Sequence, residues 1–209
     1  PEVYLGLLPG AGGTQRLPRL AGIEASIDII SSGLTFDMVR ALEIGVIDAL
    51  IDDPKQDLFQ FVSKIVRAGC KVRRTKEILE KIENNGKNKA AIFEARKSLA
   101  ISVNSLQAHG KIIDCVEAAM NLNFIDGLKF ESAAFTELIS TEESIGMIHA
   151  FFAERASSKI PEVGLVAPRN LRKIGVIGGG VMGSGITIAA LKAGFEVVML
   201  ERDKESLAE

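Results

Sequence analysis

The chain has 209 residues, of which 47% are hydrophobic and 25% are charged, a composition that indicates a folded globular protein and excludes a disordered one. Its formal net charge of −2 gives no reason to expect a nucleic-acid partner, and no apolar run reaches the ~18 residues of a membrane-spanning helix. The two cysteines, Cys70 and Cys115, lie far apart, so we expect buried, reduced thiols in place of a disulfide framework, and we assign no metal site.

The opening 20 residues hold two clusters of glycine and proline. Such clusters predict a loop that makes unusual turns or runs close to another group. Two short helices are predicted next, at 23–32 and 36–43. Gly33 stops the first, while Thr35 caps the start of the second and Gly45 stops it.

A strand-like run at 46–51 precedes about 100 residues of helical pattern that start at Asp57. The sequence at 140–143 is typical of a capping box and predicts a last helix at 144–157. Both histidines, His109 and His149, lie in helical stretches and are interpreted as packed residues, not catalysts. An alanine-rich helix is expected at 90–105, after a break at 84–86. Apolar stripes, which we interpret as packing faces, lie at 58–65, 78–82, 112–119, 130–138 and 145–152.

A linker without periodicity is followed by an apolar run at 173–177 and by the glycine loop Gly178-x-Gly180-x-x-Gly183. A strand before this motif and a helix after it are the context of a dinucleotide-binding turn. The first glycine permits the tight turn, the second lets the backbone approach a pyrophosphate, and the third lets helix and strand pack closely. Val181 and Met182 start the helix whose N–H groups would hold the pyrophosphate. The alternative for this motif is a tight turn without a ligand.

A second apolar run at 196–200 ends in Glu201, about 20 residues after the loop. An acid at this place binds the ribose hydroxyls of NAD and disfavours NADP, whose 2′-phosphate would face the carboxylate. The neighbouring Arg202 weakens the discrimination slightly, since an arginine there accommodates a phosphate. The alternative is a solvated strand end.

The glycine loop begins only about 30 residues before the end of the chain. A complete nucleotide-binding domain needs on the order of 100 residues or more. Because the first residue is Pro1 and no signal-peptide pattern follows it, we expect an internal piece of a longer protein, truncated at both ends.

Several segments resemble known families. The first 19 residues, PEVYLGLLPGAGGTQRLPR, resemble the second half of the enoyl-CoA hydratase (crotonase) family motif nearly residue for residue. Further similarity to multifunctional fatty-acid β-oxidation enzymes, in which such a hydratase/isomerase is fused to an L-3-hydroxyacyl-CoA dehydrogenase, is found in SG at 32–33, ALEIGVID at 41–48, FFAER at 151–155 and IGGGVMGSGI at 177–186.

The resemblance implies that Glu2 is one of two acid/base carboxylates and that the peptide N–H of Gly10 helps to hold the reacting water. It places the partner glutamate and the oxyanion-hole N–H groups upstream, and the dehydrogenase histidine, serine and asparagine downstream, of this chain. A basic run at 64–76 then has two readings, a contact to CoA phosphates or a solvated face, and we favour the second. From chemistry alone Glu2 would be a surface glutamate.

We therefore predict an α/β protein made of the C-terminal part of a crotonase-fold core at 1–56, a helical region at 57–158, a linker at 159–171, and the first βαβ unit of a Rossmann NAD-binding domain at 172–209. The expected activities of the longer protein are hydration of 2-enoyl-CoA and NAD-linked oxidation of 3-hydroxyacyl-CoA, with enoyl-CoA isomerisation as an option. Acyl-CoA thioesters are the expected partners, in bacterial cytoplasm or in a peroxisome, and the chain alone is expected to be inactive. The alternatives are a non-catalytic nucleotide or acyl-CoA binding module, and a fusion whose hydratase half is degenerate.

Overall fold

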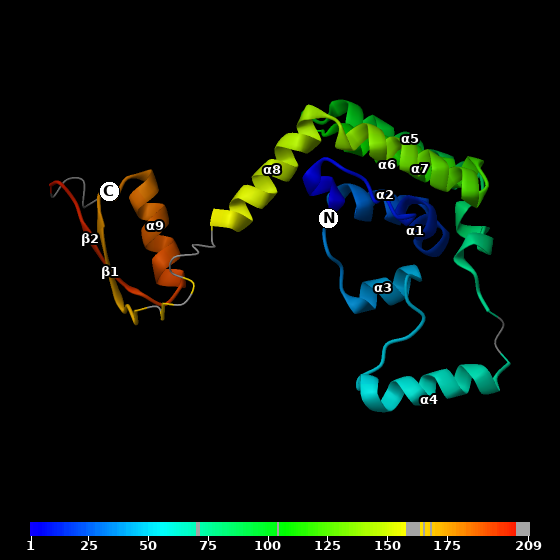
Figure 1. Ribbon diagram of the computed structural model, residues 1–209, viewed down its shortest axis with the longest axis horizontal. Coiled ribbons are helices and arrows are strands. Elements are labelled where there is room, and N and C mark those ends of the chain that lie inside the picture. Colours follow the sequence, from blue (N-terminus) through cyan, green and yellow to red (C-terminus); the bar gives the residue numbers. More distant parts are fainter. Residues whose placement is uncertain (70–71, 104, 158–163, 165, 168, 204–209) are drawn as a thin grey trace. The chain divides into compact units, whose positions relative to one another are not determined.

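The computed structural model describes residues 1–69, 72–103, 105–157, 164, 166–167 and 169–203 (Figure 1). The chain divides into two compact units, Pro1–Ser158 and Lys159–Glu209. Cys70 and Lys71, most of the predicted linker, and the residues after Asp203 lie outside the described residues. In the part of the chain that is described, no helix is long and apolar enough to cross a membrane.

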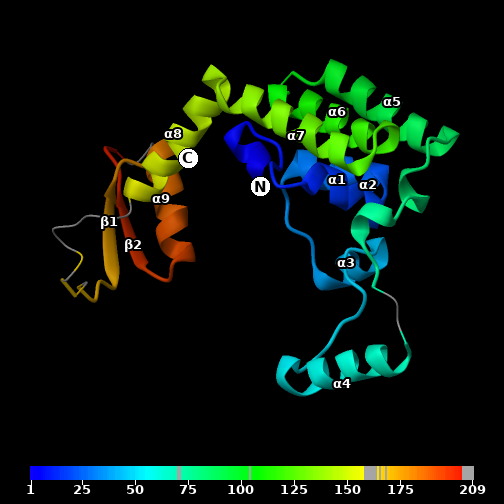
Figure 2. The ribbon, with the colours of Figure 1, turned by 45° about the vertical axis from the view of Figure 1, so that its right-hand side comes forward.

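Helices make up the first unit. Its elements are η1 (Glu2–Leu5), α1 (Gly13–Ala21), α2 (Ile23–Ser32), α3 (Met38–Ile44), α4 (Pro54–Arg67), η2 (Thr75–Glu77), η3 (Glu80–Ile82), α5 (Gly86–Ile101), α6 (Gln107–Asn121), α7 (Phe124–Ile139) and α8 (Glu142–Ser157). In both ribbon views α5, α6 and α7 run side by side, with α1 and α2 against them (Figures 1 and 2).

The hydrophobic core of this unit is centred on α6, whose inward face is buried almost completely because α1, α2, α5 and α7 all pack on it. This confirms the stripe predicted at 112–119. The buried core residues are Val3, Leu7, Leu8, Ile23, Ile27, Ile30, Ile82, Ile92, Ala108, Ile112, Ile113, Cys115, Val116, Ala134 and Leu138.

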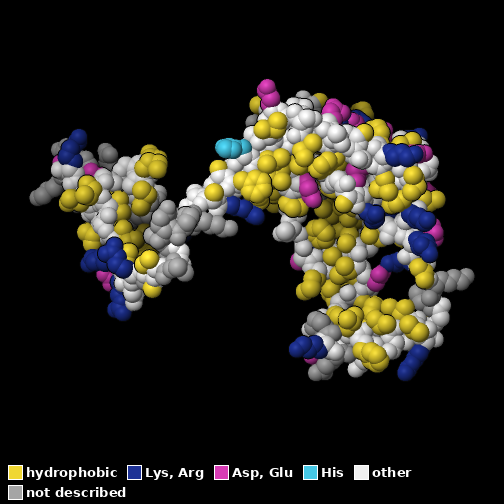
Figure 3. All heavy atoms as spheres, in the orientation of Figure 1, with side chains coloured by type: hydrophobic (Ala, Val, Ile, Leu, Met, Phe, Trp, Pro, Cys, Tyr) yellow, Lys and Arg dark blue, Asp and Glu magenta, His cyan; other side chains and the backbone are white. Residues whose placement is uncertain are grey.

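Other predicted stripes remain on the surface. On α4 most of the apolar side chains are exposed, Phe59 to 78%, and they form a hydrophobic patch on that helix (Figure 3). On α8, Ile145 and Phe152 are also exposed, whereas Ile148 packs against the core. A helical period identifies an apolar face, but not what covers it.

The strand-like run at 46–51 was predicted wrongly, because the structure has no strand there. The N–H groups of Val46 and Ile47 bond to the carbonyl of Ala41, at 2.9 and 3.3 Å, where α3 ends at Gly45. These backbone groups are therefore satisfied by a helix C-terminus, and a run of apolar residues without a paired neighbour does not make a strand.

Helix stops were predicted better than helix starts. α2 ends before Gly33 and α3 before Gly45. The two glycines have φ of 63° and 85°, the left-handed conformation expected of glycine caps. The predicted cap Thr35 is wrong, since Asp37 accepts the N–H of Arg40 at 2.8 Å and starts α3. The helix expected at 90–105 is Gly86–Ile101, and the one expected at 144–157 is Glu142–Ser157. At 78–82 the structure has one short 3-10 turn, η3, in place of a longer helix.

In its described residues the second unit has two parallel strands and one helix: β1 (Lys173–Ile177), α9 (Val181–Lys192) and β2 (Glu196–Leu200). Ile174 pairs with Val197 and Val176 with Met199 along the ladder. The predicted strand, loop, helix and strand are confirmed in this order. The described chain is thus mostly helical, with a small parallel sheet in the strand-helix-strand order of a Rossmann βαβ unit.

Candidate functional site

The glycine loop at 178–183 joins β1 to α9, and its shape is set by one left-handed glycine and two hydrogen bonds. Gly178 has φ of +92°, a left-handed conformation that side-chain-bearing residues rarely adopt. Its N–H bonds to the carbonyl of Leu200 at 2.8 Å, which ties the loop to the end of β2. The hydroxyl of Ser184 donates to the carbonyl of Gly179. The loop is therefore shaped before any ligand arrives.

Gly180 and Gly183 differ in what surrounds them. A Cβ on Gly183 would lie 1.7 Å from the carbonyl oxygen of Gly178, so only glycine allows α9 to pass this close to the turn. A Cβ on Gly180 would meet nothing within 4 Å. Gly180 therefore leaves an open approach to the backbone, at the residue that precedes α9.

The start of α9 is free to receive a negative charge. Its N-cap, Gly180, carries no side chain that could bond the first N–H groups of the helix. Val181 and Met182 are 93% and 76% exposed, so their side chains leave this helix end open to solvent. A helix N-terminus of this kind attracts phosphate oxygens through its N–H groups and its dipole.

Glu201 lies against the same loop. Its carboxylate accepts the N–H of Gly179 and, at 2.9 Å, the N–H of Arg202. These bonds, Gly179 first, hold the pKa of the Glu201 carboxyl below its usual range, so the group is ionised at neutral pH. The side chain of Arg202 bonds to Asp203 at 2.8 Å, which directs this guanidinium toward a neighbouring carboxylate.

Together these features fit NAD. The residues that would hold it are Gly178, Gly180 and Gly183 at the pyrophosphate turn, with Val181 and Met182 at the helix start. Glu201 is ionised and bonds directly to Gly179 of the loop, so its carboxylate is suited to accept hydrogen bonds from ribose hydroxyls. The structure thus brings all the predicted cofactor residues together.

The two residues predicted for hydration lie in the first unit. Glu2 opens η1, and its side chain is 44% exposed. Gly10 lies in the turn before α1, where a Cβ would come within 2.7 Å of the Phe135 ring on α7. The carbonyl of Glu2 accepts the N–H of Leu7 at 3.1 Å, which closes the short helix that leads toward the turn. Gly10 thus lies close to a helix more than 100 residues away in sequence.

A buried carboxylate near this turn was missed by the sequence analysis. Glu131 on α7 is 1% exposed, and it accepts the N–H of Gly12 at 2.5 Å, the N–H of Thr14 at 2.9 Å and the hydroxyl of Thr14 at 2.6 Å. The sequence does contain a signal for it. Glu131 shares the buried face of α7 with Gly127, Ala134 and Leu138, so a charged residue stands where the helical period requires an apolar one.

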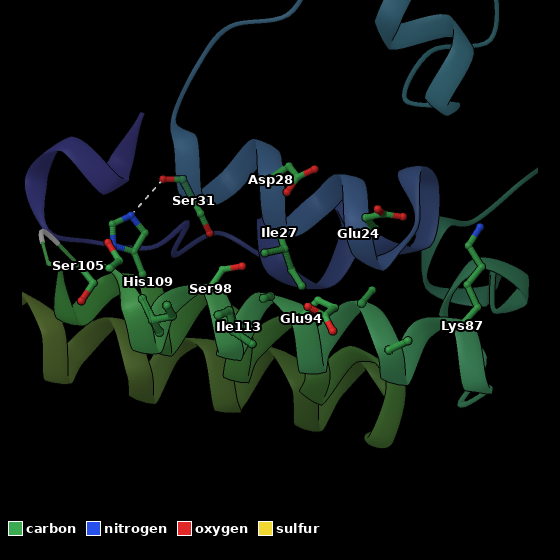
Figure 4. Close-up of a pocket in the computed structure, with 15 residues that line it drawn as sticks. Glu24, Ile27, Asp28, Ser31, Lys87, Glu94, Ser98, Ser105, His109 and Ile113 are labelled. Atoms are coloured by element: carbon green, nitrogen blue, oxygen red, sulfur yellow. Dashed lines mark hydrogen bonds between the residues drawn. The ribbon is translucent and has the colours of Figure 1, made fainter.

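A cleft lies elsewhere in the first unit, between α2 and α5 with α6 beneath (Figure 4). It has a volume of about 650 Å³, and its rim carries Glu24, Asp28 and Glu94 beside Lys87. At one end the ring of His109 bonds to the carbonyl of Ser31 at 3.2 Å and accepts the N–H of Leu106 at 2.9 Å. Both ring nitrogens are therefore occupied, and none of the predicted site residues lines this cleft.

The basic run at 64–76 does not form a common site in the described residues. Arg73 pairs with Asp48 at 2.5 Å and Arg74 with Glu77 at 3.9 Å. These exposed ion pairs favour a solvated face. Among the same described residues, no group of three or more His, Cys, Asp or Glu is arranged to hold a metal ion.

Residues 173–209 match the family described as 3-hydroxyacyl-CoA dehydrogenase, NAD binding domain. The chain is 33% identical to the peroxisomal fatty acid beta-oxidation multifunctional protein AIM1 of Arabidopsis thaliana. The alignment extends over 213 residues and covers 99% of this chain and 29% of that protein. It is 36% identical to the fatty acid oxidation complex subunit alpha of Vibrio parahaemolyticus, over 97% of this chain and 29% of the relative. It is 35% identical to the subunit of the same name from Shewanella frigidimarina, over 89% of this chain and 27% of the relative.

The recognition made from the sequence is thereby confirmed. Over nearly its whole length the chain corresponds to a segment of a fatty-acid β-oxidation multifunctional enzyme, and NAD is the cofactor of its second unit. The chain spans less than a third of the length of these relatives.

Proposed function

We propose that this chain is an internal part of a longer enzyme, here called the parent, that hydrates 2-enoyl-CoA and then oxidises 3-hydroxyacyl-CoA with NAD. The observation that carries the proposal is the match of 99% of the chain to a β-oxidation multifunctional protein, with the glycine loop folded at its dehydrogenase end. In this proposal residues 1–56 complete a crotonase-fold core, 57–158 form the helical region, 159–171 link the units, and 172–209 begin the NAD-binding domain.

On the dehydrogenase side this chain binds and orients the cofactor. Gly178 and Gly180 admit the pyrophosphate to the start of α9, Gly183 keeps that helix against the turn, and Glu201 receives the ribose. NAD, when bound, supplies the hydride acceptor for carbon 3 of the hydroxyacyl group. The acid/base residues of this step belong to the remainder of the parent, so we propose that the chain alone does not turn over.

On the hydratase side Glu2 supplies one carboxylate and Gly10 one peptide N–H. Hydration breaks an O–H bond of water, forms a C–O bond at carbon 3 of the enoyl thioester, and delivers a proton to carbon 2. Two carboxylates share the two proton transfers, since one accepts while the other donates. The N–H of Gly10 holds the water in place, which lowers the entropy cost of the addition. The same pair of carboxylates would serve an enoyl-CoA isomerase.

The hydratase role is tested by steady-state assays with crotonyl-CoA on the parent and on its Glu2→Gln variant. The substitution keeps the size of the side chain and removes its proton-accepting charge, so hydratase kcat should fall by at least ~100-fold. NAD-linked oxidation of 3-hydroxybutyryl-CoA is the internal control and should stay within about twofold. Turnover that survives in Glu2→Gln would remove the role proposed for Glu2.

The same assays separate the two rival readings. A parent that oxidises 3-hydroxyacyl-CoA but does not hydrate crotonyl-CoA would be a fusion with a degenerate hydratase half. A parent that binds NADH and acyl-CoA without either turnover would be a binding module.

The compartment is proposed to be a peroxisome or bacterial cytoplasm; one of the relatives is named as peroxisomal.

A further inference from the structure

One face of α7 forms the support beneath the turn at 10–14. Leu128, Glu131 and Phe135 follow one another at spacings of three and four residues, so they lie on the same side of the helix. A Cβ on Gly12 would lie 3.0 Å from Leu128, and one on Gly10 would lie 2.7 Å from the Phe135 ring. Between these two packing contacts stands the carboxylate of Glu131.

Glu131 makes the polar part of this support. Its two oxygens accept hydrogen bonds from Gly12 and Thr14, across 117 to 119 residues of sequence, at a buried site. Gly12 is the N-cap of α1 and has φ of +90°. A carboxylate at this end of the helix satisfies N–H groups that have no partner in the helix itself. Bonds from a charged acceptor are the stronger kind, and losing one in a buried site leaves its donor unpaired.

We propose that Glu131 is a positioning residue of the hydratase site, and that α7 thereby sets where the peptide N–H of Gly10 lies. The inference rests on the proposed function, because it gives Gly10 its task. Gly10 stands two residues before Gly12, so a shift of the N-cap moves the peptide that holds the water. The helical region is then a working part of the hydratase rather than a spacer between two sites.

The test uses the parent with Glu131→Gln as the main variant. A glutamine turns one acceptor oxygen into a donor, which must face the N–H of Gly12 or the Thr14 donors. Hydratase kcat for crotonyl-CoA should fall by ~10- to 100-fold while KM changes by less than about threefold, because displacement of a reacting group by about 1 Å costs up to ~100-fold in rate without loss of substrate binding.

Two further substitutions give a graded series. Thr14→Val removes one of the three bonds and leaves the carboxylate in place, so kcat should fall by roughly 3- to 10-fold. Thr14→Ser keeps the hydroxyl and should stay within about twofold of wild type. The control is Glu137→Gln on the same helix, which removes the same charge from an exposed side chain and should leave kcat within about twofold. Thr14→Val also keeps the test decisive where Glu131→Gln does not fold.

A positioning role is separated from a merely structural one by calorimetric titration with butyryl-CoA, a saturated thioester that binds and does not react. Its affinity should stay within about threefold in every variant. A parallel loss of affinity and kcat would show that the turn had unfolded, and would overturn the proposal. The proposal is also overturned if the parent hydrates crotonyl-CoA and the Glu131→Gln and Glu137→Gln variants have the same hydratase kcat. A parent without hydratase turnover refutes the proposed function itself.

Discussion

At the scale of single residues, we propose that Glu201 makes the site prefer NAD over NADP. The bonds from Gly179 and Arg202 keep it ionised, and an ionised carboxylate repels a 2′-phosphate while it accepts ribose hydroxyls. Glu201→Gln should weaken NADH binding to the parent by ~10-fold and change NADPH binding much less, so that the preference narrows. Fluorescence titration with both cofactors measures this. Tighter binding of NADPH than NADH by the wild type would refute the assignment.

Cys115 shows how a buried thiol links stability to pH. It is fully buried on α6 and free, and burial, followed by the charges of Glu131 and Asp114, raises the pKa of its thiol from 9.0 to about 12. In the unfolded chain the thiol ionises from about pH 9, where the folded protein keeps its proton. The thiol's contribution to stability is therefore complete below pH 9 and is lost as the pH rises toward 12.

The measurement is urea unfolding of the chain at a series of pH values, compared with Cys115→Ala. The wild type should lose stability between pH 9 and pH 10.5 faster than the variant, since the variant lacks this group but shares all other titrations.

In a Cys70→Ser background, Cys115 should react with a thiol reagent at least ~100-fold more slowly in the folded state than in urea. Equal reactivity in both states would show that α6 is open.

At the scale of elements, the turn from β1 to α9 allows a matched pair of substitutions. Gly180→Ala places a methyl group in open space, so folding should be unchanged while the pyrophosphate is kept away from the backbone. Gly183→Ala drives a Cβ into the carbonyl of Gly178, which should cost about 1–3 kcal/mol through displaced backbone. NADH titration and thermal unfolding of the parent distinguish them: both variants should lose affinity, and only Gly183→Ala should lose stability.

The elements also show why the sequence predicts some features and not others. The stops at Gly33 and Gly45 were predictable because a left-handed cap is a local demand on one residue. Thr35 and Asp37 are both competent N-caps, and the preference of residue types for this position does not distinguish them; in the structure Asp37 takes it. The run at 46–51 has the composition of a strand, but a strand exists only where another strand pairs with it.

The candidate sites divide in the same way. The proposed NAD turn could be predicted from the sequence, because its residues follow one another between 178 and 201 and their spacing alone places them close together. The support under Gly10 was not found, because Glu131 and Phe135 come from a helix far along the chain. A buried glutamate in an apolar stripe is the kind of exception that indicates a long-range polar contact.

At the scale of the whole molecule, the two units differ in how much they bury. In the first, Ala108, Ile112 and Val116 of α6 have no exposed surface. In the described part of the second, only Val176 and Ala190 are buried among the apolar residues, and Ile177 is 86% exposed. Because the second unit buries so few apolar side chains, local opening should be far easier in β1 and β2 than in α6.

Hydrogen exchange on this 209-residue chain tests that difference. Amides of β1 and β2 should exchange at least ~100-fold faster than those of α6, because opening free energies follow buried apolar contact. Ile112→Ala should speed exchange in α6, since it removes a fully buried side chain at a cost of about 2–5 kcal/mol. It should leave β1 unchanged, because Ile112 and β1 belong to different compact units. An equal acceleration in α6 and β1 would mean that the units open together, and the division of the chain at Ser158 would then have no energetic meaning.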